Sequence, residues 1–241
     1  MDKTIFTLVT GCDSKYFNYM LRALNNIFEL VNKNNDDNLI INVILYDLGL
    51  TTKQVENIKE KYKKIIYNKF DFNKYPEHVS LEKYNGINCS YAWKPIIFDE
   101  VCRKYKNLVL WFDSRSFYYN FHNIIKTIKK EGIYCAASNH NIETWNHHKT
   151  LDFMKGCIYK KNTSRAAGTI SVNYNLEWIQ NLVSDWKKYS LIKECIIPEG
   201  SDRNNHRQDQ AVLEILYFRY QEKYKFNIID NYIDFEVQKP L

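Results

Sequence analysis

The sequence has 241 residues, of which 45% are hydrophobic, 15% aromatic and 26% charged. This balance is typical of a soluble globular chain and excludes collagen, a coiled coil and an intrinsically disordered protein. A chain of this length buries enough surface for one sizeable core without a disulfide or metal staple. We therefore expect a single domain over residues 1–241.

The charge pattern does not favour a nucleic acid as the partner. The formal net charge is +6, from 34 Lys and Arg against 28 Asp and Glu. The densest basic run, Lys59–Lys69, is interleaved with apolar residues, and we interpret it as a solvated helix end that leads into a strand. A nucleic-acid binder usually gathers its basic residues on one face. Such a binder stays open as a third class of function, and it would require a contiguous basic face.

Cysteine spacing and hydropathy indicate a reducing compartment. The six cysteines form no Cys-x-x-Cys pair and no short cysteine–histidine spacing of a zinc site, so we interpret them as buried free thiols. The N-terminal residues lack the pattern of a signal peptide, and no apolar run approaches the roughly 20 residues of a membrane span. We expect a cytoplasmic protein without a transmembrane segment.

Strands and helices alternate in the first part of the chain. Residues 4–10 are β-branched and apolar and end at Gly11, which predicts a buried strand. Asp13 or Ser14 can cap the next helix, whose apolar residues recur on one face between residues 17 and 31. Three elements continue the alternation: a strand over 39–46, a polar helix over 51–62 and a strand over 64–70.

The second part of the chain continues this pattern. Pro95 suits the first turn of a helix to Tyr105, and Asp113 directly follows a strongly apolar strand over 108–112. The polar stretch 138–165 is longer than an ordinary connection, so we expect a functional loop or small subdomain. The other predicted elements are helices over 121–130, 173–189 and 207–220 and strands over 133–137 and 166–172. The alternation predicts an α/β fold with a Rossmann-like, mostly parallel central sheet flanked by helices, which binds ligands at the carboxyl ends of its strands.

Four short segments carry side chains suited to chemistry at that sheet edge. They contain Asp113 after a buried strand, Gly11 to Ser14 after the first strand, Lys94 in a Tyr-Ala-Trp-Lys segment, and Asp209-Gln210 at the start of a late helix. Backbone amides at a helix start can receive a base, ribose or phosphate, although Gly-x-Gly-x-x-Gly and Walker patterns are absent. Each segment also has a structural interpretation, as element caps or as a surface lysine beside a core tryptophan.

Taken in chain order, five segments carry a family resemblance. They are Val9–Tyr16, Tyr91–Lys94, Val109–Asp113, Arg165–Asn173 and Asp209–Leu213. Together they resemble the landmarks of GT-A glycosyltransferases of family 8, the glycogenin and lipopolysaccharide galactosyltransferase type, over about residues 4–222. The resemblance implies a GT-A fold and retaining transfer of a sugar from a nucleotide diphosphate donor, with a UDP-sugar expected, to a carbohydrate or glycoprotein acceptor. Inversion stays open, because an Asp-Gln at a helix start does not reveal stereochemistry.

The resemblance also implies roles for individual residues. Catalysis is assigned to Asp209, Gln210, Lys94 and Asp113. Donor and nucleotide binding is assigned to Thr10, Gly11, Cys12, Asp13, Tyr16, Lys94, Asp113, Ser114, Arg115, Ala167, Gly168 and Arg207. In the 138–165 stretch, Trp145, His147 and His148 are expected to contact the acceptor, by stacking on a sugar ring or by bonding its hydroxyls. A polar surface loop with one anchoring tryptophan is the alternative interpretation.

Two departures from the family bear on the metal. Asp113-Ser114-Arg115 replaces the family's Asp-x-Asp, and no histidine follows His206 to match its C-terminal metal ligand. Asp113 is a candidate ligand for Mn²⁺ or Mg²⁺, but we expect Arg115, Lys94 and Arg207 to supply part or all of the positive charge that the departing diphosphate requires. The same departure allows a catalytically inactive nucleotide-sugar-binding or assembly protein. The presence of Lys94 and Asp209 favours an enzyme.

Overall fold

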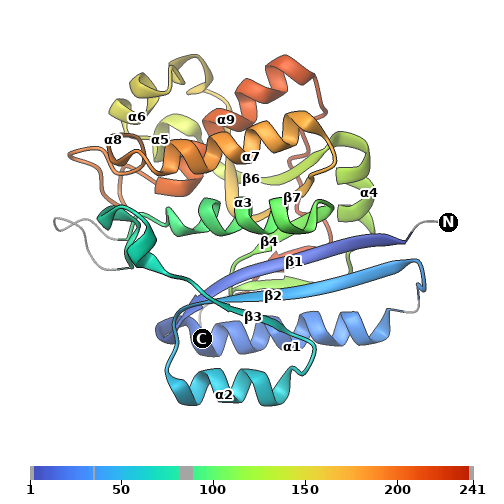
Figure 1. Cartoon of the computed structure of the whole chain (residues 1–241). Helices are drawn as coiled ribbons and strands as arrows, with labels where there is room; N and C mark the ends of the chain where they lie inside the picture. The colour runs from blue at the N-terminus through green and yellow to red at the C-terminus, as the bar shows by residue number, and fades with distance from the viewer. Residues whose placement is uncertain (1–2, 35, 82–88, 239–241) are drawn as a thin grey trace.

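The computed structural model describes residues 3–34, 36–81 and 89–238, which include a central sheet of six strands (Figure 1). The strand order is β3 (Ile66–Lys69), β2 (Leu39–Gly49), β1 (Thr4–Asp13), β4 (Leu108–Phe112), β7 (Thr163–Asn173) and β6 (Ile133–Asn141). β1 pairs in parallel with β2 and β4, and β2 with β3. β7 pairs antiparallel with both β4 and β6. The sheet is therefore mostly parallel, which confirms the predicted fold class.

Helices cover both faces of this sheet. Figure 1 shows α1 and α2 on one side of it and α3 and α7 on the other. The first face packs against α1 (Phe17–Lys33), α2 (Thr52–Lys61) and α4 (His122–Glu131), and the second against α3 (Trp93–Tyr105), α7 (Glu177–Ser190) and α9 (Gln208–Tyr224). All six helices were predicted. α7 begins later than expected because Asn173 still belongs to β7, and its side-chain oxygen accepts the Asn175 N–H in the intervening turn.

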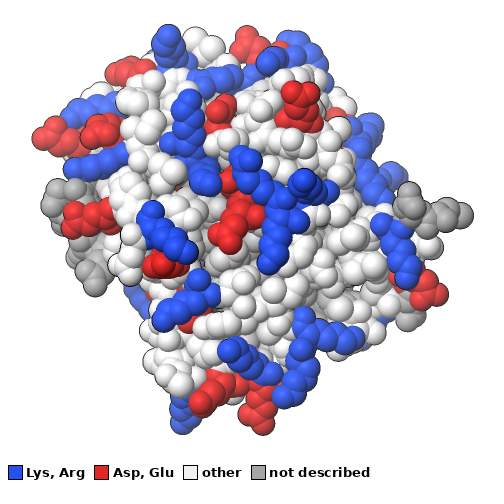
Figure 2. Space-filling model, in the orientation of Figure 1, with Lys and Arg blue, Asp and Glu red and all other residues white. Residues whose placement is uncertain are grey.

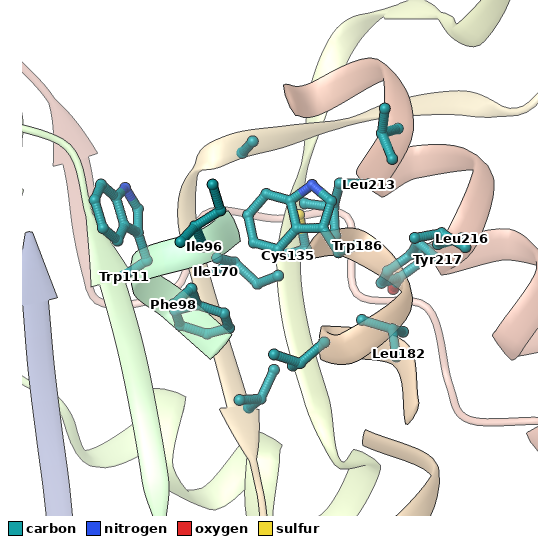
Figure 3. Close-up of a cluster of buried hydrophobic side chains, with 14 of the residues drawn as sticks. Ile96, Phe98, Trp111, Cys135, Ile170, Leu182, Trp186, Leu213, Leu216 and Tyr217 are labelled. Atoms are coloured by element: carbon teal, nitrogen blue, oxygen red, sulfur yellow. The ribbon is translucent and has the colours of Figure 1, made fainter. Parts of the chain in front are cut away.

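Side-chain alternation along the strands fills both layers. On β4, Leu108, Leu110 and Phe112 belong to the core beside α1 and α4, whereas Val109 and Trp111 belong to the core beside α3. Figure 3 shows part of the second core, where side chains of α3, α7 and α9 meet those of β4 and β7. This double coverage explains why the parallel strands are continuous apolar runs in the sequence.

The polar stretch 138–165, expected to be a functional loop or small subdomain, consists largely of strand ends and short helices. β6 continues to Asn141 and β7 already begins at Thr163. Between them lie the short helices α5 (Ile142–Trp145) and α6 (His148–Phe153). Helices of four and six residues span less than two turns, so they show no helical periodicity in a sequence.

Three other short elements were not predicted. β5 (Ser116–Tyr118) pairs antiparallel with β8 (Phe235–Val237), so the C-terminal segment returns beside the end of β4. α8 (Lys193–Ile196) lies between α7 and α9 in the chain. Their few residues give no pattern that sequence reasoning detects.

The structure also bears on the expected burial of the cysteines and on membrane-spanning helices. Of the cysteines, which are all free, Cys12, Cys102, Cys135 and Cys195 are buried as expected. Cys157 is exposed and Cys89 half-buried, contrary to the prediction for these two. Among the described helices, none is long and apolar enough to cross a bilayer.

Basic and acidic side chains are mixed on the surface shown in Figure 2. Lys and Arg are scattered over this face, and Asp and Glu lie among them. A binder that follows a phosphate backbone needs its cations gathered along one stripe. This face therefore gives no support to the nucleic-acid alternative.

The chain that enters α9 is fixed by a buried histidine. His206 is fully buried; its Nε2 donates to the Ile196 carbonyl at 2.8 Å, and its Nδ1 accepts the His147 N–H at 3.2 Å. Only a neutral ring that carries its proton on Nε2 can form both bonds at once. Burial lowers the pKa of His206 to about 4 and so favours this neutral ring.

Acid should therefore weaken this anchor. Because the folded pKa lies below the unfolded value near 6.5, the stabilisation is complete above pH 6.5 and is lost as the pH falls towards 4, by up to about 3 kcal/mol. Urea unfolding of the wild type and of His206→Gln over pH 4–7 measures this, since the difference isolates His206 from the carboxyl groups. We expect a shallower decline in the variant. Parallel pH profiles would contradict the assignment.

Candidate functional site

A pocket of about 850 Å³ lies at the edge of the sheet where β1 and β4 end. Its described lining includes five cationic side chains and three carboxylates, so the wall carries a net positive charge. The charged residues are Lys15, Lys94, Arg115, Arg203, Arg207, Asp13, Asp113 and Asp209. The pocket is where a doubly wound sheet binds ligands, and its charge suits an anionic one.

Lys94 in the first turn of α3 connects three elements of this wall. Its ammonium lies 3.1 Å from Asp113 Oδ1 and 3.1 Å from Asp209 Oδ2, and it donates to the Ala167 carbonyl at 3.3 Å. Only 6% of the side chain is exposed. Burial alone would lower the pKa of Lys94, but the two carboxylates outweigh it and raise the pKa above its ordinary value. Lys94 is therefore charged.

Asp209 is the buried partner and Asp113 the open one. The Asp209 side chain is 9% exposed, and burial raises its pKa, an effect that the Lys94 ammonium opposes. The Trp186 indole donates to the Asp209 carbonyl at 2.9 Å and fixes the start of α9. Asp113 is 45% exposed to the pocket, and its Oδ1 accepts the Trp111 indole N–H at 2.7 Å. Asp113 is thus oriented by its own strand and free to meet a ligand.

Gly168 on β7 allows this arrangement of carboxylates. The Asp113 N–H donates to the Gly168 carbonyl at 2.8 Å, which holds the end of β4 against β7. A Cβ on Gly168 would lie 3.2 Å from Asp113 Oδ2, tighter than ordinary van der Waals contact. Glycine therefore leaves room for the carboxylate and for a ligand beside it.

The three arginines of the pocket are held differently. The Arg115 guanidinium donates twice to the Gln238 carbonyl, at 3.1 and 2.8 Å. Arg203 lies over the Tyr91 ring, 5.6 Å from its centroid, and Arg207 lies over the Trp145 ring at 3.8 Å. The sequence analysis missed Arg203, although its spacing of four residues from Arg207 was a signal that could have drawn attention to it.

The structure brings most of the expected donor residues together. Gly11, Cys12, Asp13, Tyr16, Lys94, Asp113, Ser114, Arg115, Ala167, Gly168, Arg207, Asp209 and Gln210 all line the pocket. Thr10 does not: it is fully buried within β1, and its hydroxyl has no hydrogen-bond partner among the described residues. Alternation along the strand turns Thr10 away from the edge on which the pocket opens.

A second pocket of about 280 Å³ adjoins the first and shares Arg207 and Gln210 with it. Its other described lining residues are Ser138, Asn139, His140, Trp145 and Tyr232. The Gln210 amide donates to Ser164 Oγ at 3.0 Å, and that hydroxyl donates to Glu214 Oε2 at 2.5 Å. Gln210 is therefore oriented at the junction of the two pockets.

Only one of the three residues assigned to the acceptor lines a pocket. Trp145 lines the second pocket, but His147 and His148 line neither pocket. His147 caps α6, where its Nδ1 accepts the Lys149 N–H at 3.3 Å, and His148 is exposed. His147 thus caps the start of α6, and the assignment of the two histidines to the acceptor stays a prediction.

The donor set does not fit a divalent cation of the family type. Among the described residues, no group of three or more His, Cys, Asp and Glu side chains is arranged to hold a metal ion. The two carboxylates nearest each other already share the Lys94 ammonium. Mn²⁺ and Mg²⁺ prefer several oxygen ligands. The third carboxylate of the described lining, Asp13, accepts the Tyr16 N–H at 3.1 Å and belongs to no such group.

Comparisons with known proteins support the fold. A family model described as a protein of unknown function (DUF1647) matches residues 2–99. No curated protein matches the sequence.

Several solved structures are similar. The bifunctional glycosyltransferase WbbM has a TM-score of 0.58 at 12% identity, over 90% of this chain and 38% of WbbM. The galactosyltransferase LgtC, solved with donor and acceptor sugar analogues, has a TM-score of 0.56 at 15% identity, over 88% of this chain and 70% of LgtC. Mouse xyloside xylosyltransferase 1 has a TM-score of 0.56 at 12% identity, over 95% of this chain and 86% of the transferase. The chain thus spans little more than a third of WbbM, and it has the GT-A fold of these glycosyltransferases.

Removing the Lys94 ammonium should destabilise the fold, because its partner Asp209 then stays buried without a counter-charge. Lys94→Met leaves Asp209 buried without a counter-charge, so we expect the free energy of unfolding at pH 7 to fall by about 3 kcal/mol. The loss should shrink when Asp209→Asn is added, because the orphaned charge is then absent. Urea unfolding of the two single variants and of the double variant measures the coupling free energy between Lys94 and Asp209. Lys15→Met, at an exposed lysine of the same pocket, is the control. Additive losses would contradict the pairing.

Proposed function

We propose that the protein is a glycosyltransferase that moves a sugar from a nucleotide diphosphate donor to a carbohydrate or glycoprotein acceptor. The observation that carries this proposal is the pair of adjoining pockets, which share Arg207 and Gln210 on a GT-A fold. Group transfer requires two substrates to meet at one reacting atom. The junction, with Asp209 beside it, is suited to that meeting.

The larger pocket is the donor side in this proposal. Gly11 to Asp13 at the end of β1 would receive the base and ribose, and Asp113 the ribose or the sugar. A uridine nucleotide is the expected donor. The smaller pocket is the acceptor side, where Trp145 and Tyr232 offer aromatic surface and His140 and Asn139 offer hydrogen bonds to hydroxyls. The short helices between β6 and β7 would thus form the acceptor wall of a single catalytic domain.

The proposed reaction breaks the bond between the anomeric carbon and the diphosphate oxygen. The electron pair stays on the diphosphate, and the acceptor hydroxyl oxygen bonds to the anomeric carbon from the same face and gives its proton to the departing phosphate. Asp209 and the Gln210 amide would stabilise the oxocarbenium-like charge. Because Asp209 is held by Lys94 and by the start of α9, it is preorganised for electrostatic stabilisation.

The catalytically inactive alternative is less well supported. A binding protein with no reaction to perform does not need a carboxylate and an ammonium buried together, since such a pair is costly to desolvate. Lys94 and Asp209 lie at 6% and 9% exposure beside the pocket junction. Their retention favours the enzyme.

Nucleotide binding gives the first test. We expect UDP, compared with GDP, dTDP and CMP, to raise the melting temperature selectively. At a hundred times the dissociation constant the gain is about 2.7 kcal/mol, or roughly 5 to 10 °C in a domain of this size. The panel is run with manganese and with chelator. If none of the nucleotides shifts the melting temperature under either condition, the proposed donor site is wrong.

Asp209→Asn tests the chemical step. The variant keeps the shape of the side chain but loses the charge next to the anomeric carbon, so we expect turnover with the best donor to fall at least about 100-fold while donor affinity changes little. Released nucleotide and calorimetric donor binding measure the two quantities. Asp37→Asn, at an exposed turn, is the matched control. Near-normal turnover would remove Asp209 from the mechanism.

A further inference from the structure

The three arginines of the main pocket, Arg115, Arg203 and Arg207, form no ion pair with a carboxylate of the described residues, and two of them lie close together in the chain. Arg203 and Arg207 lie four residues apart in the segment that leads into α9, and both line the pocket. Neither forms an ion pair with any carboxylate in residues 3–34, 36–81 and 89–238, whereas Lys94 contacts two. Two guanidinium groups placed together in this way lack a counter-charge.

Each guanidinium is aimed by an aromatic ring and one hydrogen bond. Arg203 lies over Tyr91 and donates to Gln208 Oε1 at 3.3 Å. Arg207 lies over Trp145 and donates to the Arg203 carbonyl at 2.6 Å. A stacked guanidinium keeps its remaining N–H groups in the plane, which is the geometry that binds phosphate oxygens in pairs. Most donors of both groups are still available to a ligand.

The backbone around the pair is strained. Tyr91 and Gln208, the two residues that contact the Arg203 side chain, have φ values of 55° and 34°. A non-glycine residue in this region is costly and persists where the surroundings enforce it, often at ligand sites. The Gln208 side chain is also fully buried, and its Nε2 has no partner among the described residues. The strained residue Gln208 lies directly between Arg207 and Asp209 in the chain, and both of these line the pocket.

Two of the other three cations of the pocket are already held by protein oxygens, and the third, Lys15, lies over the Tyr16 ring at 5.6 Å and lacks the planar fork of an arginine. The Lys94 ammonium is balanced by Asp113 and Asp209, and the Arg115 fork donates to the Gln238 carbonyl. Burial and the neighbouring charge of Arg203 lower the pKa of Arg207, a like-charge cost that a bound anion would relieve. Arg203 and Arg207 are therefore the cations best able to meet a dianion.

We propose that Arg203 and Arg207 together bind the diphosphate of the nucleotide and stand in for the divalent cation. The proposal rests on the proposed function for the identity of the nucleotide. It revises the expectation that Arg115, Lys94 and Arg207 share this role: Arg207 keeps it, and Arg203 replaces the other two. Lys94 instead lies between the Asp113 and Asp209 carboxylates and holds them in place. When the glycosidic bond breaks, the electron pair moves onto the diphosphate oxygen, and the arginine pair neutralises the charge that develops there.

Calorimetry in excess chelator tests the pair, with inorganic pyrophosphate, UDP and uridine as probes. We expect wild-type protein to bind pyrophosphate and UDP without metal. Arg203→Ala and Arg207→Ala should each weaken both ligands by about tenfold and leave uridine affinity unchanged, because uridine has no phosphate. Arg203→Lys should recover part of the loss, since it keeps the charge but not the fork. Arg22→Ala, at an exposed arginine of α1 outside both pockets, is the control.

The outcomes separate this inference from the proposed function. If UDP binds only with Mn²⁺ or Mg²⁺ and with equal affinity in the alanine variants, the arginine pair is not the diphosphate site, while the donor pocket stands. If pyrophosphate binds in chelator and is lost in the variants, but UDP binds no better than pyrophosphate, the anion site stands and the nucleotide-sugar function falls. Equal melting temperatures of the free proteins exclude misfolding as the cause of a loss.

Discussion

The buried ammonium of Lys94 is the interaction on which the site depends. It connects the start of α3, the end of β4 and the start of α9, because Asp113 and Asp209 both reach it at 3.1 Å. Any one of these groups buried alone would carry a desolvation cost of several kcal/mol. The three elements are therefore fixed relative to one another by charge, and the hydrophobic cores on either side of the sheet supply the rigidity that keeps the charges in register.

Sequence reasoning reached much of this arrangement through the sheet. The apolar runs of β1 and β4 predict strands buried on both faces, and parallel strands bring their carboxyl ends to one edge. That argument alone places Asp13 near Asp113. Placing Lys94 and Asp209 at that edge required a further assumption, that the helices on which they lie begin there. The order of the motifs along the chain suggested it. The strand and helix predictions succeed because they follow from periodicity, which a sequence encodes locally, whereas the roles of Lys94 and Asp209 were assigned by the resemblance to a family.

The parts that failed depend on tertiary contacts or on very short elements. Arg203 gains its position from the ring of Tyr91, more than a hundred residues away in the chain, and from a left-handed backbone at Gln208. Neither contact leaves a local signal. The helices α5 and α6 escaped prediction for a different reason. They are too short to show periodicity, so the polar stretch was interpreted as a functional loop or small subdomain, and the capping role of His147 could not be foreseen.

The segment Asp113-Ser114-Arg115 contributes one carboxylate and one guanidinium to the pocket. The Arg115 guanidinium holds the residue after β8 to the pocket wall through the Gln238 carbonyl. Because the described lining has five cationic side chains against three carboxylates, its field attracts an anion directly. This charge balance is consistent with a pocket that meets its ligand through arginines.

The junction between the pockets joins this charge to the second substrate side. Arg207 faces both pockets, and Gln210 is held by a chain that runs through Ser164 to the buried carboxyl of Glu214. Burial raises the pKa of Glu214 to about 8, although Asn146 and the Arg165 N–H also donate to it. Because α9 carries Gln208, Asp209, Gln210 and Glu214 within two turns, a small shift of this helix start moves the anion-binding and junction groups together. α9 thus contributes groups to both pockets, which under the proposed function would keep the donor and acceptor sides in a fixed relation.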